Sequence, residues 1–429
     1  MPGSPASTNN GSDLDHGVLD AMGYDLSVHS FSRLKPYLRW IELSSPGKRE
    51  KEAYLRLFTD VVRHFGNENR QPQHTTIQTY VDGIVNGHPN HYYFNDTLPR
   101  SAERLTSVKE TILIIIGVWT LMKPYFILMQ GQQRHVVLSS CLKSGIPYSE
   151  EEAFNQLPSS LINSCGLLPN PDESTMLPET AQGTGTADQL STYRTADFSF
   201  GLHAGLIESH SITTRVLNMT RLSSLAGVSI IWTDNLSRHL LLSKAGQKCY
   251  LELFALPCAL QGRKPEYLHK AGISPALVYE VQSTYANLFN PVRVSSIHRA
   301  LVKYTGLRYF CWCVGCTAWR FRARKIKKLS REPSWNRGAP GWSAQLPYDP
   351  ELEFLIIQEA TSWNQVAFRN LWPRILELDH HLQAARPWNF WILFRDNRDT
   401  VQYWTFLFGS IILFLTVVQV ALGAAQVAG

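Results

Sequence analysis

The sequence lacks every complete short motif of catalysis or cofactor binding that a chain of this length commonly carries. It has no Gly-rich phosphate loop, no dinucleotide fingerprint, no His-Glu-x-x-His motif and no Gly-x-Ser-x-Gly nucleophile elbow. Each of these motifs places groups around a phosphate, a metal or an acyl carbon, so their absence lowers the odds of nucleotide, zinc and hydrolase chemistry. We therefore expect no cofactor and no metal, and favour an interaction protein over an enzyme.

Cysteine is also scarce. The 429 residues include seven cysteines, at positions 141, 165, 249, 258, 311, 313 and 316. An odd, scattered set in a chain of this size is not a disulfide framework, so reduced thiols in a cytosolic compartment are expected. Asn-x-Ser/Thr sequons begin at positions 10, 95, 218 and 235, and a cytosolic domain would leave them unused.

The first 30 residues contain no Lys, no Arg and no apolar run. They therefore lack the basic and hydrophobic parts of a secretory signal peptide. Four aspartates lie in this stretch, at positions 13, 15, 20 and 25. We predict that residues 1–30 form a disordered acidic leader.

Charge is absent from the other end of the chain. Residues 400–429 contain no Asp, Glu, Lys, Arg or His, and Tyr403 to Leu422 is predominantly apolar. About 20 apolar residues are what a helix needs to cross the hydrocarbon layer, and a core helix of this length normally shows a polar stripe. The pattern predicts one transmembrane helix over residues 401–424, with a short tail at 425–429.

The residues beside this helix predict its orientation. Basic residues precede the span and none follows it, so the N-terminal side should face the cytosol, with an endomembrane favoured as the location. Aromatic and basic side chains next to a span suit the headgroup layer. The membrane-contact candidates here are Trp388, Trp391, Arg395, Arg398, Tyr403 and Trp404.

The rest of the chain predicts an α+β fold, mainly α-helical, with a small central β element. We expect a helical region at 31–166, a flexible linker at 167–195, an α+β region at 196–331, a loop at 332–350 and a helical juxtamembrane region at 351–400. The apolar run 111–122 is too short to span a bilayer and is expected to be a buried core helix.

Individual elements follow from caps and periodicity. Helices are predicted at 47–65, after the Ser149–Glu152 capping box, at 275–289, at 351–369 and at 373–385. Strands are predicted at 228–232 and 249–254, and Asp234 is expected to cap a helix that continues to Leu242.

Two segments carry a resemblance. The run Ile-Trp-Thr-Asp-Asn-Leu-Ser-Arg-His-Leu at 231–240, with Leu-Glu-Leu-Phe at 251–254, resembles a segment of an uncharacterised family of fungal proteins. The pattern Leu-Trp-Pro-Arg-Ile-Leu-Glu-Leu at 371–378, before a C-terminal span, is similar to others of that family. The resemblance implies a membrane-associated protein and assigns no site residues.

A basic segment follows three closely spaced cysteines. Seven Lys or Arg residues lie between Arg320 and Arg331. Lipidated thiols beside a polybasic run would make a second membrane contact, through Cys311, Cys313, Cys316, Trp319, Arg322, Lys325 and Lys328. The alternatives are a solvated basic helix, nucleic-acid binding through 319–331, which is the less favoured partner, and a zinc site, which lacks a fourth ligand.

Two further spacings suggest chemistry. His91 and Asp96 have the His-x4-Asp form of glycerolipid acyltransferases, in which the histidine acts as general base and the aspartate orients it. The later Glu-Gly-Thr-Arg block of those enzymes is absent, so this pair is a weak catalytic candidate. Glu-x-x-His pairs at 266/269, expected in a loop, and at 377/380, expected on a surface helix, are attributed to chance.

These patterns together predict a cytosolic domain tethered by a C-terminal span. Its expected role is interaction, scaffolding or regulation at a membrane surface, with the bilayer and an unknown protein as partners. The alternatives are a membrane-bound lipid-modifying enzyme that uses His91 and Asp96, and a nucleic-acid-binding protein.

Overall fold

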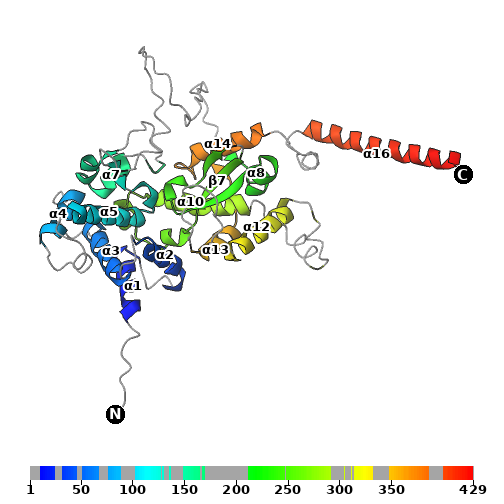
Figure 1. Ribbon diagram of the computed structural model, residues 1–429. Coiled ribbons are helices and arrows are strands. Elements are labelled where there is room, and N and C mark those ends of the chain that lie inside the picture. The colour runs from blue at the N-terminus through cyan, green and yellow to red at the C-terminus, as the bar shows by residue number, and fades with distance from the viewer. Residues whose placement is uncertain are drawn as a thin grey trace, which may run out of the picture.

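A computed structural model describes most of the chain (Figure 1). The described residues are 10–24, 31–45, 51–66, 76–87, 102–126, 128–129, 135–136, 148–164, 167–169, 211–246, 248–290, 304, 311, 314–331, 347–385 and 400–428. The molecule is α+β and mainly helical, as predicted, with sheets of two and three strands.

Helices of the N-terminal third pack together. They are α1 (Asn10–Ala21), α2 (Phe31–Leu43), α3 (Lys51–Gly66), α4 (Ile77–Gly87) and α5 (Ala102–Trp119). Helix α3 contacts α1, α2 and α5, and α5 also contacts α4. Side chains of α5 from Ile112 to Trp119 are largely buried against this group. The prediction that the apolar run 111–122 is a core helix is therefore confirmed. The helix predicted at 47–65 is α3, which begins at Lys51 among the described residues.

The prediction of a disordered acidic leader is wrong for residues 10–24. These residues form α1 and the turn after it, and α1 packs against α3. Val18, Leu19 and Met22 are fully buried, whereas Asp13 and Asp20 are exposed. Apolar residues at helical spacing thus lie among the acidic residues. The prediction was based on the acidic composition and the absence of Lys and Arg, and it overlooked this spacing.

A three-stranded sheet forms the centre of the molecule. Its order is β5 (Ser229–Thr233), β7 (Lys248–Phe254), β6 (Leu241–Ala245), with β7 parallel to β5 and antiparallel to β6. Both predicted strands are confirmed. The predicted helix from Asp234 to Leu242 is wrong. Only Leu236–Arg238 are helical, as the short 3-10 helix η3, and from Leu241 the chain forms β6, which pairs with the free edge of β7.

Helices α8 (Met219–Leu225), α10 (Pro275–Phe289) and α14 (Trp372–Ala384) lie around this sheet (Figure 1). The predicted start of α10 is confirmed, since Ser274 caps it by accepting a hydrogen bond from the Leu277 amide (3.1 Å). The helix predicted at 373–385 is confirmed as α14.

The helix predicted at 351–369 is wrong after its second turn. Helix α13 (Glu351–Ile357) ends early, and Trp363–Asn364 form strand β8, which pairs with β4 (Ser211–Ile212). The reason is tertiary: Trp363 is fully buried and its indole donates to the Leu217 carbonyl (3.0 Å). A continuous helix would not place this side chain there.

The remaining elements are short, apart from α12. They are η1 (Lys123–Tyr125), η4 (Pro257–Leu260), α6 (Glu150–Phe154), α7 (Pro158–Ser164), α9 (Pro265–Lys270), α12 (Val314–Arg331) and strands β1 (Leu128–Met129), β2 (His135–Val136) and β3 (Tyr148–Ser149). The capping box between Ser149 and Glu152 is confirmed at the start of α6. Glu266 and His269, expected in a loop, lie on α9.

One hydrophobic core joins the two halves that the sequence separates at the 167–195 linker. The same cluster of buried side chains runs from Val18 in α1 to Leu382 in α14. Among the side chains that the structure describes, the cluster includes none from the last helix, α16 (Thr400–Ala428), which extends away from the rest of the protein (Figure 1).

Candidate functional site

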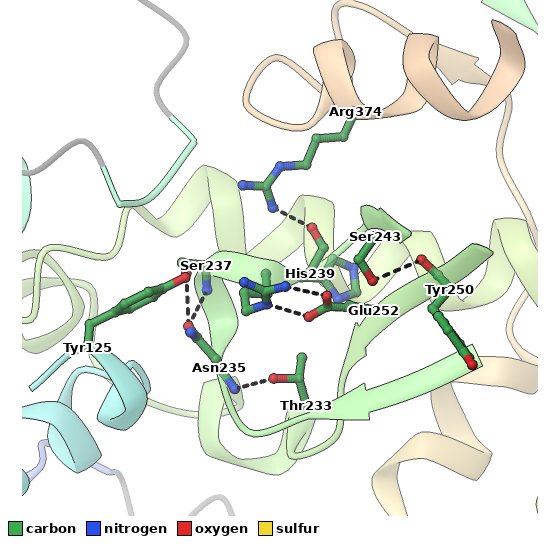
Figure 2. Close-up of polar contacts among 10 residues, drawn as sticks. Tyr125, Thr233, Asn235, Ser237, His239, Ser243, Tyr250, Glu252 and Arg374 are labelled. Carbon is green, nitrogen blue, oxygen red and sulfur yellow. Dashed lines mark hydrogen bonds and ion pairs between the residues drawn. The ribbon is translucent and has the colours of Figure 1, made fainter. Parts of the chain in front are cut away.

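Buried polar side chains are concentrated where β5 passes into η3. Thr233, Asp234, Asn235, Ser237 and His239 are each 5% exposed or less. Such a concentration inside a protein requires hydrogen-bond partners, because an unpaired buried polar group costs about 1–3 kcal/mol. Figure 2 shows how these residues, apart from Asp234, are connected with their neighbours.

The turn itself is held by its own side chains. The Asn235 amide donates to Thr233 Oγ1 (3.0 Å), and the Ser237 amide donates to Asn235 Oδ1 (3.1 Å). Ser237 Oγ donates to the same Asn235 oxygen (2.9 Å) and lies 3.3 Å from the Tyr125 hydroxyl of η1. The Leu236 amide donates to the carbonyl of Leu121, just after α5 (2.9 Å). The turn therefore connects the sheet to the N-terminal helices.

A two-point ion pair joins η3 to the central strand β7. Glu252, in the middle of β7, has no exposed surface, and Arg238 donates to it through Nε and Nη2, both at 2.5 Å. Two parallel hydrogen bonds from one guanidinium satisfy both carboxylate oxygens, which is the arrangement that a buried carboxylate requires. The sequence did not single out Glu252. Its only signal was one acidic residue between two leucines of a predicted strand.

A second arginine, Arg374 of α14, also contacts this cluster. Arg374 Nη1 donates to the backbone carbonyl of His239 (2.5 Å), so the segments at 231–240 and 371–378 are in direct contact (Figure 2). The pKa of Arg374 is lowered to about 10, mainly by burial and also by the nearby Arg238, while Tyr125, Glu377 and Glu252 oppose the shift.

His239 is the group in this cluster that most resembles a catalytic base, but its contacts assign it a structural role. Its Nδ1 accepts a hydrogen bond from the Phe254 amide (3.1 Å), so the proton is on Nε2, which donates to Thr284 Oγ1 (2.8 Å). Thr284 Oγ1 donates to the Val281 carbonyl (2.6 Å). Both ring nitrogens are therefore occupied, and neither contacts Ser237.

The electrostatics of His239 agree with this role. Its pKa is lowered to about 3, mainly by burial and also by the nearby Arg374. A general base works best with a pKa near the operating pH. His239 is thus a neutral link between β7 and α10, and the Ser, His and Asp side chains of this segment do not form a nucleophilic triad.

A second buried polar cluster joins η4 to α13. Asp349 is 1% exposed and accepts hydrogen bonds from the amides of Cys258 (2.8 Å) and Glu351 (2.9 Å). Burial raises the pKa of Asp349 to about 6, against the lowering effect of these hydrogen bonds. Burial also raises the pKa of the Cys258 thiol well above its usual range, so this cysteine is not an activated nucleophile.

A groove of about 330 Å³ lies between η4, α9 and α10. Its lining residues are Leu260, Gln261, Gly262, Arg263, Pro265, Leu268, Pro275, Val278 and Gln282. Arg263 is the only charged member, and its Nε and Nη1 already donate to the carbonyls of Met22 and Trp119 (both 3.2 Å). The groove therefore offers no acid–base pair.

The predicted membrane-contact segment forms α12, on the surface of the domain. The helix packs against α8 and α10, and Phe321 stacks on Phe289 with ring centroids 6.4 Å apart. Trp319, Arg322 and Lys325 are half-buried on this helix. The interpretation of Cys316 as a lipid-facing thiol is wrong, because its side chain is 3% exposed and lies on the inner face of the helix. Cys311 is half-buried.

Several predicted site residues fall outside the described residues or have side chains that are not described. His91, Asp96, Cys313, Trp388, Trp391, Arg395 and Arg398 lie outside them, and for Lys328 and Tyr403 only the helical backbone is described. Trp404 is 48% exposed and stacks on Phe408 (5.7 Å) in α16. Within the described ranges, no group of three or more His, Cys, Asp or Glu side chains is placed to hold a metal ion.

No family model, curated protein or solved structure matches this chain. Its class therefore rests on its own geometry. It is a mainly helical α+β protein with one C-terminal helix that is long and apolar enough to cross a membrane.

Proposed function

We propose that this chain is a membrane-tethered interaction protein whose folded domain works at the cytosolic face of the bilayer. The observation that carries the proposal is α16. Within it, Phe408–Gln426 has a mean hydropathy of 2.1 and none of its residues is buried against the protein. The other helices of the described chain bury their apolar side chains in one core, whereas α16 has no protein surface to bury against.

The physical argument is the cost of this exposure in water. Ile412, Leu413 and Phe414 are 63%, 67% and 67% exposed. Burying an apolar side chain of this size contributes about 1.5–3 kcal/mol, and a bilayer provides that burial along the full length of the helix. The cytosolic placement of the domain rests on the positive-inside rule, since Arg386, Arg395 and Arg398 lie shortly before α16.

An interaction role is preferred to catalysis because the buried groups best suited to acid–base or nucleophilic chemistry are already held in structural roles. His239 is held neutral between two elements, Glu252 is paired with Arg238, and the Cys258 thiol has a raised pKa. These are the groups that an enzyme would need free and activated.

Membrane attachment is tested by changing the centre of α16. Leu413→Arg with Leu415→Arg places two charges at the middle of the span, at a cost of roughly 2.5–3.5 kcal/mol each on insertion scales. We expect this variant to become soluble, whereas the matched Leu413→Ala/Leu415→Ala variant stays in the pellet after a carbonate wash. A chain without residues 400–429 should also be soluble. Retention of that shortened chain in the carbonate pellet would contradict the single anchor.

Orientation needs a separate experiment. A glycosylation sequon added after Gly429, on a polar spacer, should be modified in microsomes if the tail is luminal. The native sequons at Asn218 and Asn235 should stay unmodified, and both side chains are fully buried in the folded domain. Modification of a native sequon without modification of the added one would reverse the proposed orientation.

A further inference from the structure

We propose that α12 and α13 together form a second membrane contact, which binds the anionic headgroups of the bilayer that α16 spans. This inference rests on the proposed membrane tether. The surface consists of the basic side chains of α12 and of two exposed apolar residues, Phe354 and Ile357, on α13. We call this surface the α12–α13 face.

The first argument is charge. Helix α12 contains seven Lys or Arg residues and no Asp or Glu. The whole chain has a formal net charge of +6, so the remainder of the protein carries 6 − 7 = −1. Adding the two glutamates of α13 leaves the two helices together at +5. The excess positive charge of the protein is therefore concentrated on this one element, where a negative surface would attract it.

The second argument is that the helix is held in place by the fold. Cys316 and Ala318 are buried, and Phe321 stacks on Phe289 of α10. Arg322 Nη1 reaches the Ile356 carbonyl of α13 (3.4 Å), which connects the two helices. With one face of α12 packed inward, Arg324 and Lys327 lie on the exposed face. The basic side chains are thus displayed by a fixed helix and need not be ordered on binding.

The third argument is the apolar pair beside the charges. Phe354 and Ile357 are 52% and 57% exposed, while Leu352, Leu355 and Ile356 of the same helix are buried. Residues three apart lie on one face of a helix, so the two exposed side chains point away from the core together. Apolar side chains that project next to Lys and Arg match the boundary between headgroups and acyl chains.

These features favour a lipid surface over nucleic acid. A duplex backbone would bind the cations of α12, but it has no apolar layer to receive Phe354 and Ile357. The tether also holds the domain near the bilayer, which raises the effective concentration of lipid at this face. Because Cys316 is buried, attraction and partial insertion carry the contact without acylation of that thiol.

The binding test uses the domain without its anchor, residues 1–399. Within the described chain, no α16 side chain belongs to the hydrophobic core, so this domain keeps its packing. It is mixed with vesicles of phosphatidylcholine alone or with phosphatidylserine added. We expect co-sedimentation with the anionic vesicles only, and a decrease when salt is raised, because surface charges are screened.

Matched variants assign that binding to the face. Arg324→Gln with Lys327→Gln should lower affinity roughly 30-fold, at about 1 kcal/mol for each basic residue near an anionic surface. Lys51→Gln with Arg56→Gln removes the same charge from exposed positions on α3 and should change affinity less than threefold. Phe354→Ser with Ile357→Ser should lower it about tenfold, through lost apolar burial, and more of this loss should persist at high salt.

Three outcomes would overturn the inference: no binding to anionic vesicles, equal loss in the α12 and α3 variants, or binding to double-stranded DNA or RNA at low salt without binding to vesicles. On the full chain, amide exchange of residues 314–331 should be slower in anionic than in neutral nanodiscs. Failure of these tests leaves the carbonate result for α16 intact, so the tether and the second contact are judged separately.

Discussion

A charged side chain can be buried only if the fold supplies its partners, and Glu252 shows this at the scale of one residue. Its carboxylate lies in the central strand without solvent contact and receives two hydrogen bonds from Arg238. Desolvating two charges offsets most of their attraction, so such a pair contributes little net stability but is costly to break. His239 is also buried with its polar atoms paired, but as a neutral ring, in which one nitrogen accepts a hydrogen bond and the other donates one.

Removing only one member of the pair should therefore be severe. Arg238→Met leaves the Glu252 carboxylate buried without a partner, and we expect a loss of about 3–5 kcal/mol in the free energy of unfolding. Replacing both residues, as Arg238→Met with Glu252→Leu, should recover most of this loss, because no charge is then stranded. Urea denaturation of the domain measures both. A single variant within 0.5 kcal/mol of the wild type would show that Glu252 finds water or another cation.

His239 gives a pH prediction. Its pKa is about 3 in the folded chain and near 6.5 when unfolded, so below pH 6.5 the unfolded chain binds a proton that the folded chain does not. Stability should then fall on acidification by up to about 1.4 kcal/mol per pH unit. In His239→Asn this loss is absent, so the difference in stability between wild type and variant should shrink from pH 7 to pH 4.5.

The matched control for this experiment is His269→Asn, which changes an exposed histidine on α9. Asp349, with its raised pKa, contributes in the opposite direction, since its ionisation costs stability as pH rises toward 6. That contribution is common to the wild type and both variants and cancels in the comparison. A constant difference between wild type and His239→Asn across this pH range would mean that His239 titrates normally.

At the scale of elements, the joints between helices are made by polar groups at their ends. Arg263 is 5% exposed, and its guanidinium donates to the carbonyls of Met22, just after α1, and of Trp119, at the end of α5. The last carbonyls of a helix carry partial negative charge, which compensates a buried cation. Arg263 therefore joins the C-terminal ends of two helices that are far apart in sequence.

Replacing this arginine should loosen α1 before the rest of the fold. Arg263→Met keeps most of the apolar volume but leaves the two carbonyls without this donor, and we expect a loss of roughly 2–4 kcal/mol. Arg263→Lys should recover part of it, because a single ammonium cannot reproduce the planar fork that reaches both carbonyls. Hydrogen exchange should show the largest increase in residues 10–24. Uniform loss of protection across the domain would instead indicate that α1 is not a separate unit.

At the scale of the molecule, burial divides the protein into two parts. Buried apolar side chains from α1 to α14 form one continuous cluster, while none of the stretch Phe408–Gln426 of α16 is buried. The sheet, η3 and α14 lie at the middle of the first part, where Arg374 contacts the His239 carbonyl across 135 residues of sequence. Hydrogen bonds inside the folded domain thus connect segments that are far apart in sequence.

Local pattern was sufficient for the elements whose signal is contained in a few neighbouring residues. The apolar helix α16, the buried run in α5, the capping box at Ser149 and the cap of α10 at Ser274 were all predictable. In each case the determining interactions span about four residues, or the composition of one segment suffices.

Tertiary structure decided the elements whose partners are distant in sequence. Strand β6 forms because β7 offers an edge, α13 ends because Trp363 has a buried site, and α1 is ordered because α3 covers its apolar stripe. The ion pair of Glu252 and the inward face of Cys316 likewise depend on which elements meet. The sequence alone thus determined the apolar C-terminal helix and several other helices, through local pattern, whereas only the fold decided which polar groups are buried and paired, because pairing requires contacts that no local pattern encodes.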